Sequence, residues 1–411
     1  MLGSWRTLTQ AQRRAFFASL GGWALDAFDF FIFVFCLRAI GAEFHAGVKT
    51  VAEGLFLTLA CRPLGALAFG WLAERYGRRP ILMLNIASYS AVQLATAFAP
   101  SLTALLALRA LFGFAMGGEW GVGSALALET LPARGRGLFS GLLQSGYVLG
   151  YLLASIVFAY AFAHVGWRGM FIIGASPALL VLYIRLGVEE SPAWTAGSAP
   201  QRASLRAVGS ALRSYVPTLG YLVLLMACFN AFAHGSQDLY PTFLQSQHGY
   251  SATVTGEIAI VMNLGALAGG ICMGALSERL GRRRTIMLAA TLALPVIPLW
   301  TGSHAPISLA AGAFLMQFMV QGAWGIVPAH LNELSPPSVR AILPGFAYQL
   351  GNLATSKMGP WQAGLAEARG GDYAFVLSLT LLVTSLALIL VTALGREARA
   401  VELRITSHHS A

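Results

Sequence analysis

Two acidic side chains stand in a long apolar stretch near the start of this sequence. Asp26 and Asp29 are three residues apart in a Phe-rich segment, a spacing that puts them on one face of a helix. Ionisable groups at the centre of a membrane helix cost about 2.5–3.5 kcal/mol each, so each needs a function or a partner. Two nearby carboxylates away from bulk water cannot both ionise at low cost, so one should hold a proton. The pair is a candidate for proton coupling, with Asp29 the favoured member; a static pairing with a basic residue, or a polar group reached by water, is the alternative.

Two further charged residues lie deep in apolar stretches. Arg62 precedes Glu74 by twelve residues, which is about 18 Å along a helix, and Glu119 lies about 15 Å before the end of its own stretch. A guanidinium at this depth can hold a carboxylate by two parallel hydrogen bonds. Arg62 is therefore a candidate for binding a substrate anion or for pairing with the two aspartates. Glu119 is a candidate proton relay or ion-pair member, or else a buried neutral carboxyl group.

A polar stripe occupies a later apolar stretch. Asn230, His234, Gln237 and Asp238 recur at helical spacing, so they share one helix face. Asp238 can orient and charge His234, whose imidazole titrates near neutral pH and therefore suits proton handling. We expect this stripe to bind substrate and to move a proton, although a single core histidine is more often structural. Pro241 should end or kink the helix just beyond, as a candidate outer gate.

Other polar residues have more open interpretations. Lys357 follows Asn352 within an apolar stretch, so both are candidates for attracting the anion from the C-terminal half. Exposure of Lys357 at the outer mouth is the alternative. Arg109 begins a stripe that continues with Gly113 and Gly117, and small residues every four positions allow helix backbones to approach closely in lipid. We predict a helix-packing function for this stripe.

The elements that hold these residues must be membrane helices. Hydrophobic residues make up 56% of the 411 residues and charged residues 11%, less than half of the roughly 25% in soluble proteins. A soluble or disordered chain is excluded, and the continuous apolar runs differ from the alternating pattern of a membrane β-barrel. At about 20 residues per span, the chain holds twelve transmembrane helices. The apolar runs lie near 15–40, 50–73, 80–99, 102–129, 137–163, 168–187, 215–237, 252–276, 285–303, 306–333, 341–364 and 373–394.

The basic residues give the orientation. Twenty of the 27 Lys and Arg residues fall on one side of the predicted spans, four on the other and three within spans. Such asymmetry places both termini and the central loop in the cytoplasm of an inner (plasma) membrane protein. It also explains the net charge of +10 without a nucleic-acid partner. The four cysteines lie inside apolar runs and no phosphate-binding loop is present, so we expect no metal, no disulfide and no cofactor other than a coupling proton.

An internal repeat divides the chain. The segment GWLAERYGRR at 70–79 recurs 204 residues later as GALSERLGRR at 274–283. Its shared positions include Gly70, Glu74, Arg75, Gly77 and Arg78 in the first copy and Gly274, Glu278, Arg279, Gly281 and Arg282 in the second. Because both copies occupy the same cytoplasmic loop, the halves form two parallel six-helix bundles around a site near the midplane. The predicted parts are an N-terminal bundle at 1–187, a central loop at 188–214, a C-terminal bundle at 215–394 and a tail at 395–411.

The repeated loop resembles the signature G-x-L-A-D-R-x-G-R-R of the major facilitator superfamily of transporters, with Glu74 and Glu278 at the acidic position. This resemblance implies that the acid meets a helix N-terminus in the neighbouring bundle and holds the outward-open state. Residues 230–242 are similar to the motif N-x-x-[ST]-H-x-[ST]-Q-D-x-x-x-T of the sialate:proton symporter branch, which includes lactate/pyruvate and sialic acid permeases. Ala233 is the one departure. The branch implies a monocarboxylate carried with a proton.

We therefore predict a proton-coupled symporter of a small organic anion, of the lactate or pyruvate class, that works as a monomer in the lipid bilayer. The alternatives are a permease for sialic acid, another organic acid or a sugar, and a proton antiporter. A membrane-embedded enzyme or a sensor is a more distant alternative. The lack of a metal or nucleophile constellation counts against an enzyme.

Overall fold

The computed structural model describes residues 8–130, 136–176, 178–190, 214–335 and 343–397. Every regular element within these ranges is a helix. Nine helical segments of this described part are long and apolar enough to cross a membrane. The predicted fold class, an all-α polytopic membrane protein, is confirmed.

The first bundle comprises the helices before the central loop. They are α2 (Gln10–Glu43), α3 (Val48–Tyr76), α4 (Arg78–Ala97), α5 (Leu102–Thr130), α6 (Arg136–Gly174) and α7 (Ala178–Gly187). Thr9 caps the start of α2 with a capping box. Its hydroxyl oxygen accepts from the backbone N–H of Gln12, and the Gln12 side-chain oxygen accepts from the backbone N–H of Thr9. Gly166, with φ of 64°, interrupts α6 and separates two of the predicted spans.

The second bundle comprises the helices after the central loop. They are α10 (Val216–Gln237), α11 (Tyr240–Ser246), α12 (Ala252–Leu280), α13 (Arg282–Ala293), the 3-10 turn η1 (Leu294–Val296), α14 (Ile297–Thr301), α15 (Pro306–Trp324), α16 (Val327–Leu334), α17 (Leu343–Thr355), α18 (Met358–Ala368) and α19 (Tyr373–Leu394). Most of the central loop and of the tail predicted from the sequence lies outside the described residues.

Three predicted spans of the second bundle, at 285–303, 306–333 and 341–364, are broken into shorter helices. Pro295 and Pro298 lack the backbone N–H that a continuous helix needs, and the chain there forms α13, η1 and α14. The helix that carries the polar stripe ends at Gln237, where the predicted run at 215–237 also ends. Pro241 lies in the first turn of α11, where a missing N–H is tolerated. The break therefore exposes backbone carbonyl groups beside the predicted site.

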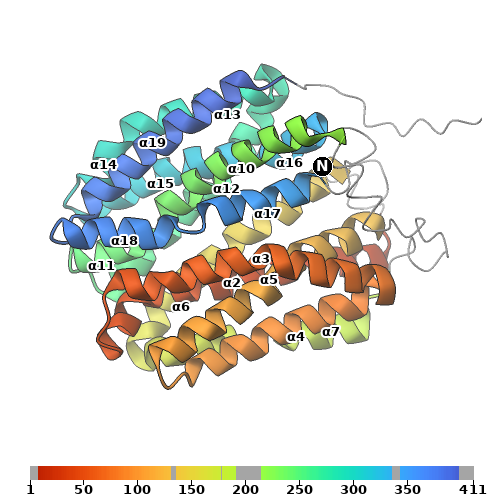
Figure 1. Cartoon of the computed structure of the whole chain (residues 1–411), viewed down its shortest axis with the longest axis horizontal. Helices are drawn as coiled ribbons and strands as arrows, with labels where there is room; N and C mark the ends of the chain where they lie inside the picture. Colours follow the sequence, from red (N-terminus) through yellow and green to blue (C-terminus); the bar gives the residue numbers. More distant parts are fainter. Residues whose placement is uncertain (1–7, 131–135, 177, 191–213, 336–342, 398–411) are drawn as a thin grey trace, which may run out of the picture.

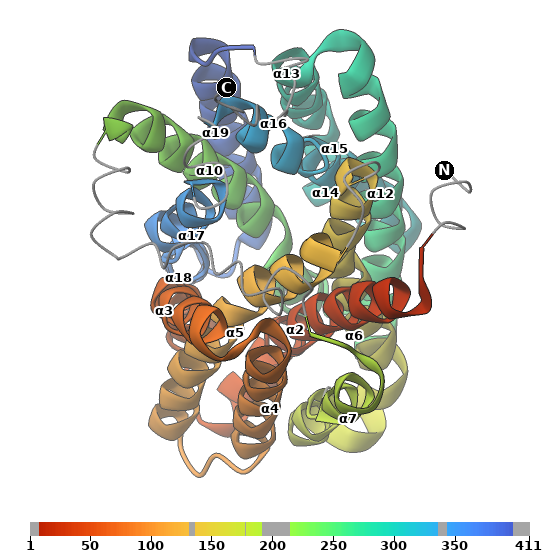
Figure 2. The same ribbon diagram turned by 90° about the vertical axis from the view of Figure 1, so that its right-hand side faces the viewer.

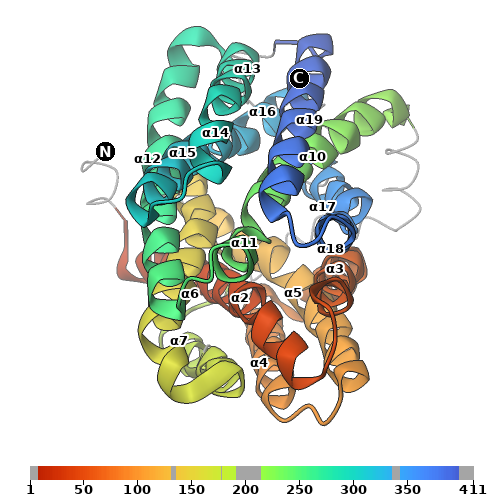
Figure 3. The same cartoon turned by 90° about the vertical axis from the view of Figure 1, so that its left-hand side faces the viewer.

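The two bundles lie one above the other in Figure 1, with α2–α7 below and α10–α19 above. Viewed from the two ends in Figures 2 and 3, they meet along two seams: α3 lies beside α17 and α18, and α6 lies beside α12. The second seam is tight because Gly256 of α12 lies against Ala159 of α6. Asn263 Nδ2 also donates to Ser155 Oγ across this seam, at 3.3 Å.

The repeat is visible in the structure as two equivalent turns. Gly77 and Gly281, with φ of 107° and 96°, connect α3 to α4 and α12 to α13. In each half, a glutamate from the end of that half caps the helix that begins after the glycine turn. Glu190 accepts from the first two backbone N–H groups of α4 at 3.1 and 3.2 Å, and Glu397 does the same for α13 at 3.1 and 3.2 Å.

Candidate functional site

Two acid–arginine neighbours lie inside the first bundle. Asp26 and Asp29 on α2 are fully buried, and their carboxylate oxygens have no hydrogen-bond partner among the described residues. The positive charge of Arg62 on α3 acts on Asp26, and that of Arg109 on α5 acts on Asp29. The two aspartates predicted from the sequence therefore each lie within electrostatic range of an arginine on a neighbouring helix, without a hydrogen bond to it.

Arg109 is held firmly in place. Its Nη2 donates to Gln93 Oε1 at 2.7 Å and to Thr96 Oγ1 at 3.3 Å, both on α4. Its guanidinium also lies 4.3 Å from the centre of the Phe112 ring. Gln93 in turn donates to the backbone oxygen of Asp29 at 3.3 Å. These contacts join α2, α4 and α5 around Asp29.

Arg62 lies at the junction of the bundles and is much less constrained. Its guanidinium is 6.0 Å from the ring of Trp23 on α2 and 5.8 Å from the ring of Tyr348 on α17. The side chain is 1% exposed, yet its Nε and Nη2 atoms have no hydrogen-bond partner in the part of the chain that the structure describes. Arg62 therefore offers unused donors to an anion between the two bundles.

Glu119 belongs to the same group of charges. It is fully buried on α5, its two carboxylate oxygens make no hydrogen bond to any described residue, and the charge of Asp26 acts on it. The carboxylate lies directly against Gly22 of α2, where any side chain would overlap it. A packing gap beside Glu119, too narrow to admit a water molecule, is also lined by Ser19, Trp23 and Leu143.

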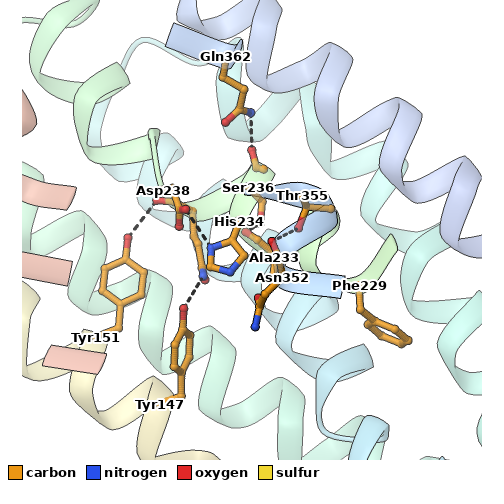
Figure 4. A network of polar contacts seen from close by, with 12 residues as sticks. Tyr147, Tyr151, Phe229, Ala233, His234, Ser236, Asp238, Asn352, Thr355 and Gln362 are labelled. Atoms are coloured by element: carbon orange, nitrogen blue, oxygen red, sulfur yellow. Dashed lines mark hydrogen bonds and ion pairs between the residues drawn. The ribbon is translucent and has the colours of Figure 1, made fainter. Parts of the chain in front are cut away.

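The polar stripe forms a second group at the end of α10 (Figure 4). His234 Nδ1 lies 2.9 Å from Asp238 Oδ2, and both side chains are buried. Gln237 connects this group to the first bundle, because its Nε2 donates to Tyr147 Oη and its backbone oxygen accepts from Tyr151 Oη, each at 3.2 Å. The end of α10 leaves that backbone oxygen free to accept.

Two buried amides, one in the stripe and one on the adjacent helix α17, have unused hydrogen-bonding groups. Asn230 is 1% exposed and Asn352 on α17 is fully buried. The Nδ2 atom of Asn230 and both polar amide atoms of Asn352 lack a hydrogen-bond partner within the described ranges. Unused hydrogen-bonding groups at this depth could be satisfied by a bound polar molecule.

Lys357 lies apart from these groups. It precedes α18, its side chain is 60% exposed, and its Nζ is 2.7 Å from Glu53 Oε2 on α3. This position agrees with the exposed alternative considered for Lys357.

The signature loops lie at the opposite end from Lys357. Arg78 is buried and donates to the Ala73 backbone oxygen at 3.0 Å. Arg282 lies 2.7 Å from Glu278 in its own loop and 3.3 Å from Glu333 on α16. The described contact of Glu278 is thus within the second bundle, in contrast to the contact with the other bundle that the family resemblance implied. The side chain of Glu74 lies outside what the structure describes.

In each signature loop, the first arginine is exposed and the first glycine has open space beside it. Arg75 lies 5.6 Å from the Trp71 ring, and Arg279 is exposed on α12. Gly70 and Gly274 have open space where a Cβ would be.

The glycine stripe lies along the contact between α3 and α5. Gly113 faces the backbone of Thr58, and Gly117 faces the backbone of Arg62. A Cβ at either glycine would overlap the α3 backbone, so these positions keep the two helices close. Thr58 Oγ1 also donates to the Arg109 backbone oxygen at 3.1 Å.

Sequence reasoning missed three tyrosines that complete the site. Tyr147 and Tyr151 are four residues apart, which puts them on one face of α6, and a buried phenol needs a hydrogen-bond partner. That spacing in an apolar run was the available signal. Tyr348 has no comparable signal, because its importance comes from the position of Arg62 in the other bundle.

A chain built from two bundles of membrane-length helices, with ionisable side chains buried within and between them, is an integral membrane protein with the architecture of a transporter. Residues 20–256 match the Major Facilitator Superfamily, and residues 218–395 match the family described as Sugar (and other) transporter. The chain therefore belongs to the major facilitator superfamily and is a transporter rather than an enzyme.

Curated relatives agree with the branch that the sequence motifs indicated. The chain is 30% identical to a carboxylic acid transporter protein homolog of Saccharomyces cerevisiae over 88% of its own length, and it spans 62% of that protein. It is 28% identical to a sialic acid transporter of Escherichia coli, covering 96% of each chain. Among solved structures, the xylose transporter of Escherichia coli in a partially occluded inward-open conformation has a TM-score of 0.74 at 17% identity, covering 92% of this chain and 97% of that one. The structural likeness supports the fold.

Proposed function

We propose that the protein is a secondary active transporter that carries a small monocarboxylate, of the lactate or pyruvate class, together with a proton. The observation that carries this proposal is Arg62, a buried guanidinium with unused donors between Trp23 of one bundle and Tyr348 of the other. A carboxylate is the natural partner for such a group. The names of the relatives, a carboxylic acid transporter homolog and a sialic acid transporter, support an organic anion.

The balance of buried charge supports coupling to a proton. Two arginines, Arg62 and Arg109, lie with three carboxylates, Asp26, Asp29 and Glu119, in the first bundle. An incoming anion would add a fourth negative charge to this group. Unbalanced charge away from water is costly, so we infer that at least one carboxylate takes up a proton when the anion binds. Asp26 is suited to this, because it and the anion would share Arg62.

The second bundle would complete the site. His234 and Asp238 form a pair that can accept and pass on a proton, while Asn230 and Asn352 can bind the rest of the acid. Rocking of the two bundles would then open the site to each side in turn. In this proposal a single chain works as a monomer in the plasma membrane, with both termini in the cytoplasm, as the arginine asymmetry indicates.

The test is uptake by purified protein in proteoliposomes. A panel of labelled lactate, pyruvate, sialic acid and a sugar is offered with and without an acidic exterior. We expect lactate or pyruvate to accumulate only when the exterior is acidic. Uptake indifferent to the gradient would refute symport, and efflux driven by proton entry would indicate an antiporter.

A matched pair of variants links the result to the site. Arg62→Gln should abolish uptake. Arg168→Gln should retain it, because Arg168 forms a partly exposed ion pair with Glu43 at 2.7 Å, away from the bundle junction. Equal activity of the two variants would contradict the assignment of Arg62.

A further inference from the structure

The short helix α18 of the second bundle lies along the first part of α3 in the first bundle. This contact is at the end of the molecule where α3 begins, on the left of Figure 1 and at the right of Figure 3. Gly359 and Gly364 of α18 permit the close approach, since Cβ atoms there would lie 3.0 Å from the side chains of Leu55 and Lys49. With the orientation proposed above, this end is the outer one.

Helix α3 lacks an N-terminal cap of its own. Gly47 occupies the N-cap position, and it has no side chain to accept from the first backbone N–H groups. The cap comes from the other bundle, because Glu367 Oε1 accepts from the backbone N–H of Lys49 at 2.9 Å. A carboxylate is favoured at this place by the partial positive charge of a helix N-terminus.

The opposite end of α18 is also fixed to α3. Lys357 Nζ, just before α18, lies 2.7 Å from Glu53 Oε2. An exposed ion pair of this kind contributes little by itself, but it sets the position of α18 along α3. Lys357 lies just before the first residue of α18 and Glu367 near its last, so the two contacts fix both ends of α18. Their partners on α3, Glu53 and Lys49, are four residues apart, about one helical turn.

Comparable carboxylate caps elsewhere in the described residues lie within a single bundle. Glu190 caps α4, Glu397 caps α13, and Asp372 Oδ1 accepts from Phe375 N at 3.0 Å at the start of α19. Those caps persist when the bundles separate as rigid bodies. The Glu367 cap differs because it exists only while α18 touches α3.

We propose that Glu367 is a positioning residue of the transport cycle, which holds the outer end closed by capping α3 from the opposite bundle. Opening of that end removes the cap and leaves the first N–H groups of α3 to water. Loss of a typical N-cap corresponds to a shift of about fivefold in an equilibrium, so removal of Glu367 should raise the outward-open fraction by about this factor.

The experiment measures access from outside in the absence of any substrate. Ser356, between α17 and α18, is 3% exposed and serves as a reporter when replaced by Cys in a chain whose four natural cysteines are changed to Ser. A membrane-impermeant maleimide is added outside intact cells. We expect Glu367→Ala to raise the labelling rate about fivefold. Asp372→Ala, which removes a cap on the same end but within one bundle, should leave the rate unchanged.

A second variant separates closure from helix stability. Gly47→Ser gives α3 its own cap, and the backbone of Gly47, with φ of −65°, accepts any residue. In the Glu367→Ala background, Gly47→Ser should restore the thermal stability of the protein while labelling stays fast. An unchanged labelling rate in both Glu367→Ala proteins, or an equal rise in Asp372→Ala, would overturn the proposal. The assay uses the membrane orientation proposed above but not the identity of the acid, so a failed uptake assay would leave its result intact.

Discussion

Replacement of Asp26 by Asn gives a direct test of how the proton and the anion are linked. Asn has the shape of Asp but cannot ionise, and Asp26 makes no hydrogen bond to a described residue that the change would break. The substitution removes the negative charge that interacts with Arg62. We expect Asp26→Asn to leave Arg62 permanently available to an anion, with no need for a proton.

The size of the effect follows from the charge balance. If Asp26 and the anion compete for Arg62, the anion binds only after Asp26 is protonated. The KM of the parent protein should then rise about tenfold for each unit of pH above the range where Asp26 holds its proton. An electroneutral symporter that carries one proton per anion accumulates its substrate about tenfold for a tenfold gradient of proton concentration. A tenfold concentration ratio corresponds to a free energy of about 1.4 kcal/mol. Asp26→Asn should show a KM that does not depend on pH and an accumulation ratio near one.

The assay compares net uptake with exchange in proteoliposomes. Asp26→Asn should retain exchange of labelled for unlabelled acid, because that reaction needs no net proton movement. Glu43→Gln is the matched control, since Glu43 lies on the same helix and pairs with Arg168 at 2.7 Å. It should keep the pH dependence of the parent. An Asp26→Asn protein that still accumulates substrate tenfold per pH unit would refute the reasoning.

Three further variants test other parts of the structure. Arg62→Lys keeps a positive charge but loses the planar fork, so the KM should rise about tenfold in uptake assays while the protein remains folded. Tyr151→Phe removes the hydrogen bond to the end of α10, so the free energy of unfolding should fall by about 0.5–1.5 kcal/mol in thermal unfolding and the transport rate should change. Tyr240→Phe is the control, because its hydroxyl group bonds within one bundle, and it should change only the stability. Gly117→Val should destabilise the protein by more than about 1–3 kcal/mol, because the valine side chain would overlap the α3 backbone, and size-exclusion profiles should show loss of folded protein. Gly70→Ala is the control and should remain folded, because there is open space around Gly70.

The sequence was most informative where one segment determines its own structure. The repeated loop at Gly77 and Gly281 predicted two equivalent halves, and the structure has equivalent turns there because a positive φ suits glycine. The helical spacing of His234 and Asp238 predicted their contact, since residues four apart meet on one helix face. The end of α10 at Gln237 agrees with the predicted run at 215–237. The chain does break beside Pro241, but the proline itself lies in the first turn of α11, where a missing N–H is tolerated.

Contacts between bundles could not be predicted in this way. Hydropathy gives the number of spans but not which of their faces meet, so Tyr348 could not be assigned to Arg62, nor Glu53 to Lys357. Both pairs join residues almost 300 or more positions apart in the chain. For the same reason Glu367 carried no signal, because its partner is a backbone group at the start of α3.

The duplicated glutamate caps also bear on how such a chain can be divided. Glu190 stands at the close of the first half and Glu397 at the close of the second, and each completes a helix of its own half. A gene split between the codons for Glu190 and Ser214 would therefore give two polypeptides that each retain their own cap. We expect co-expressed fragments of this kind to insert separately and then to join along the α6–α12 seam, because each half supplies its own cap.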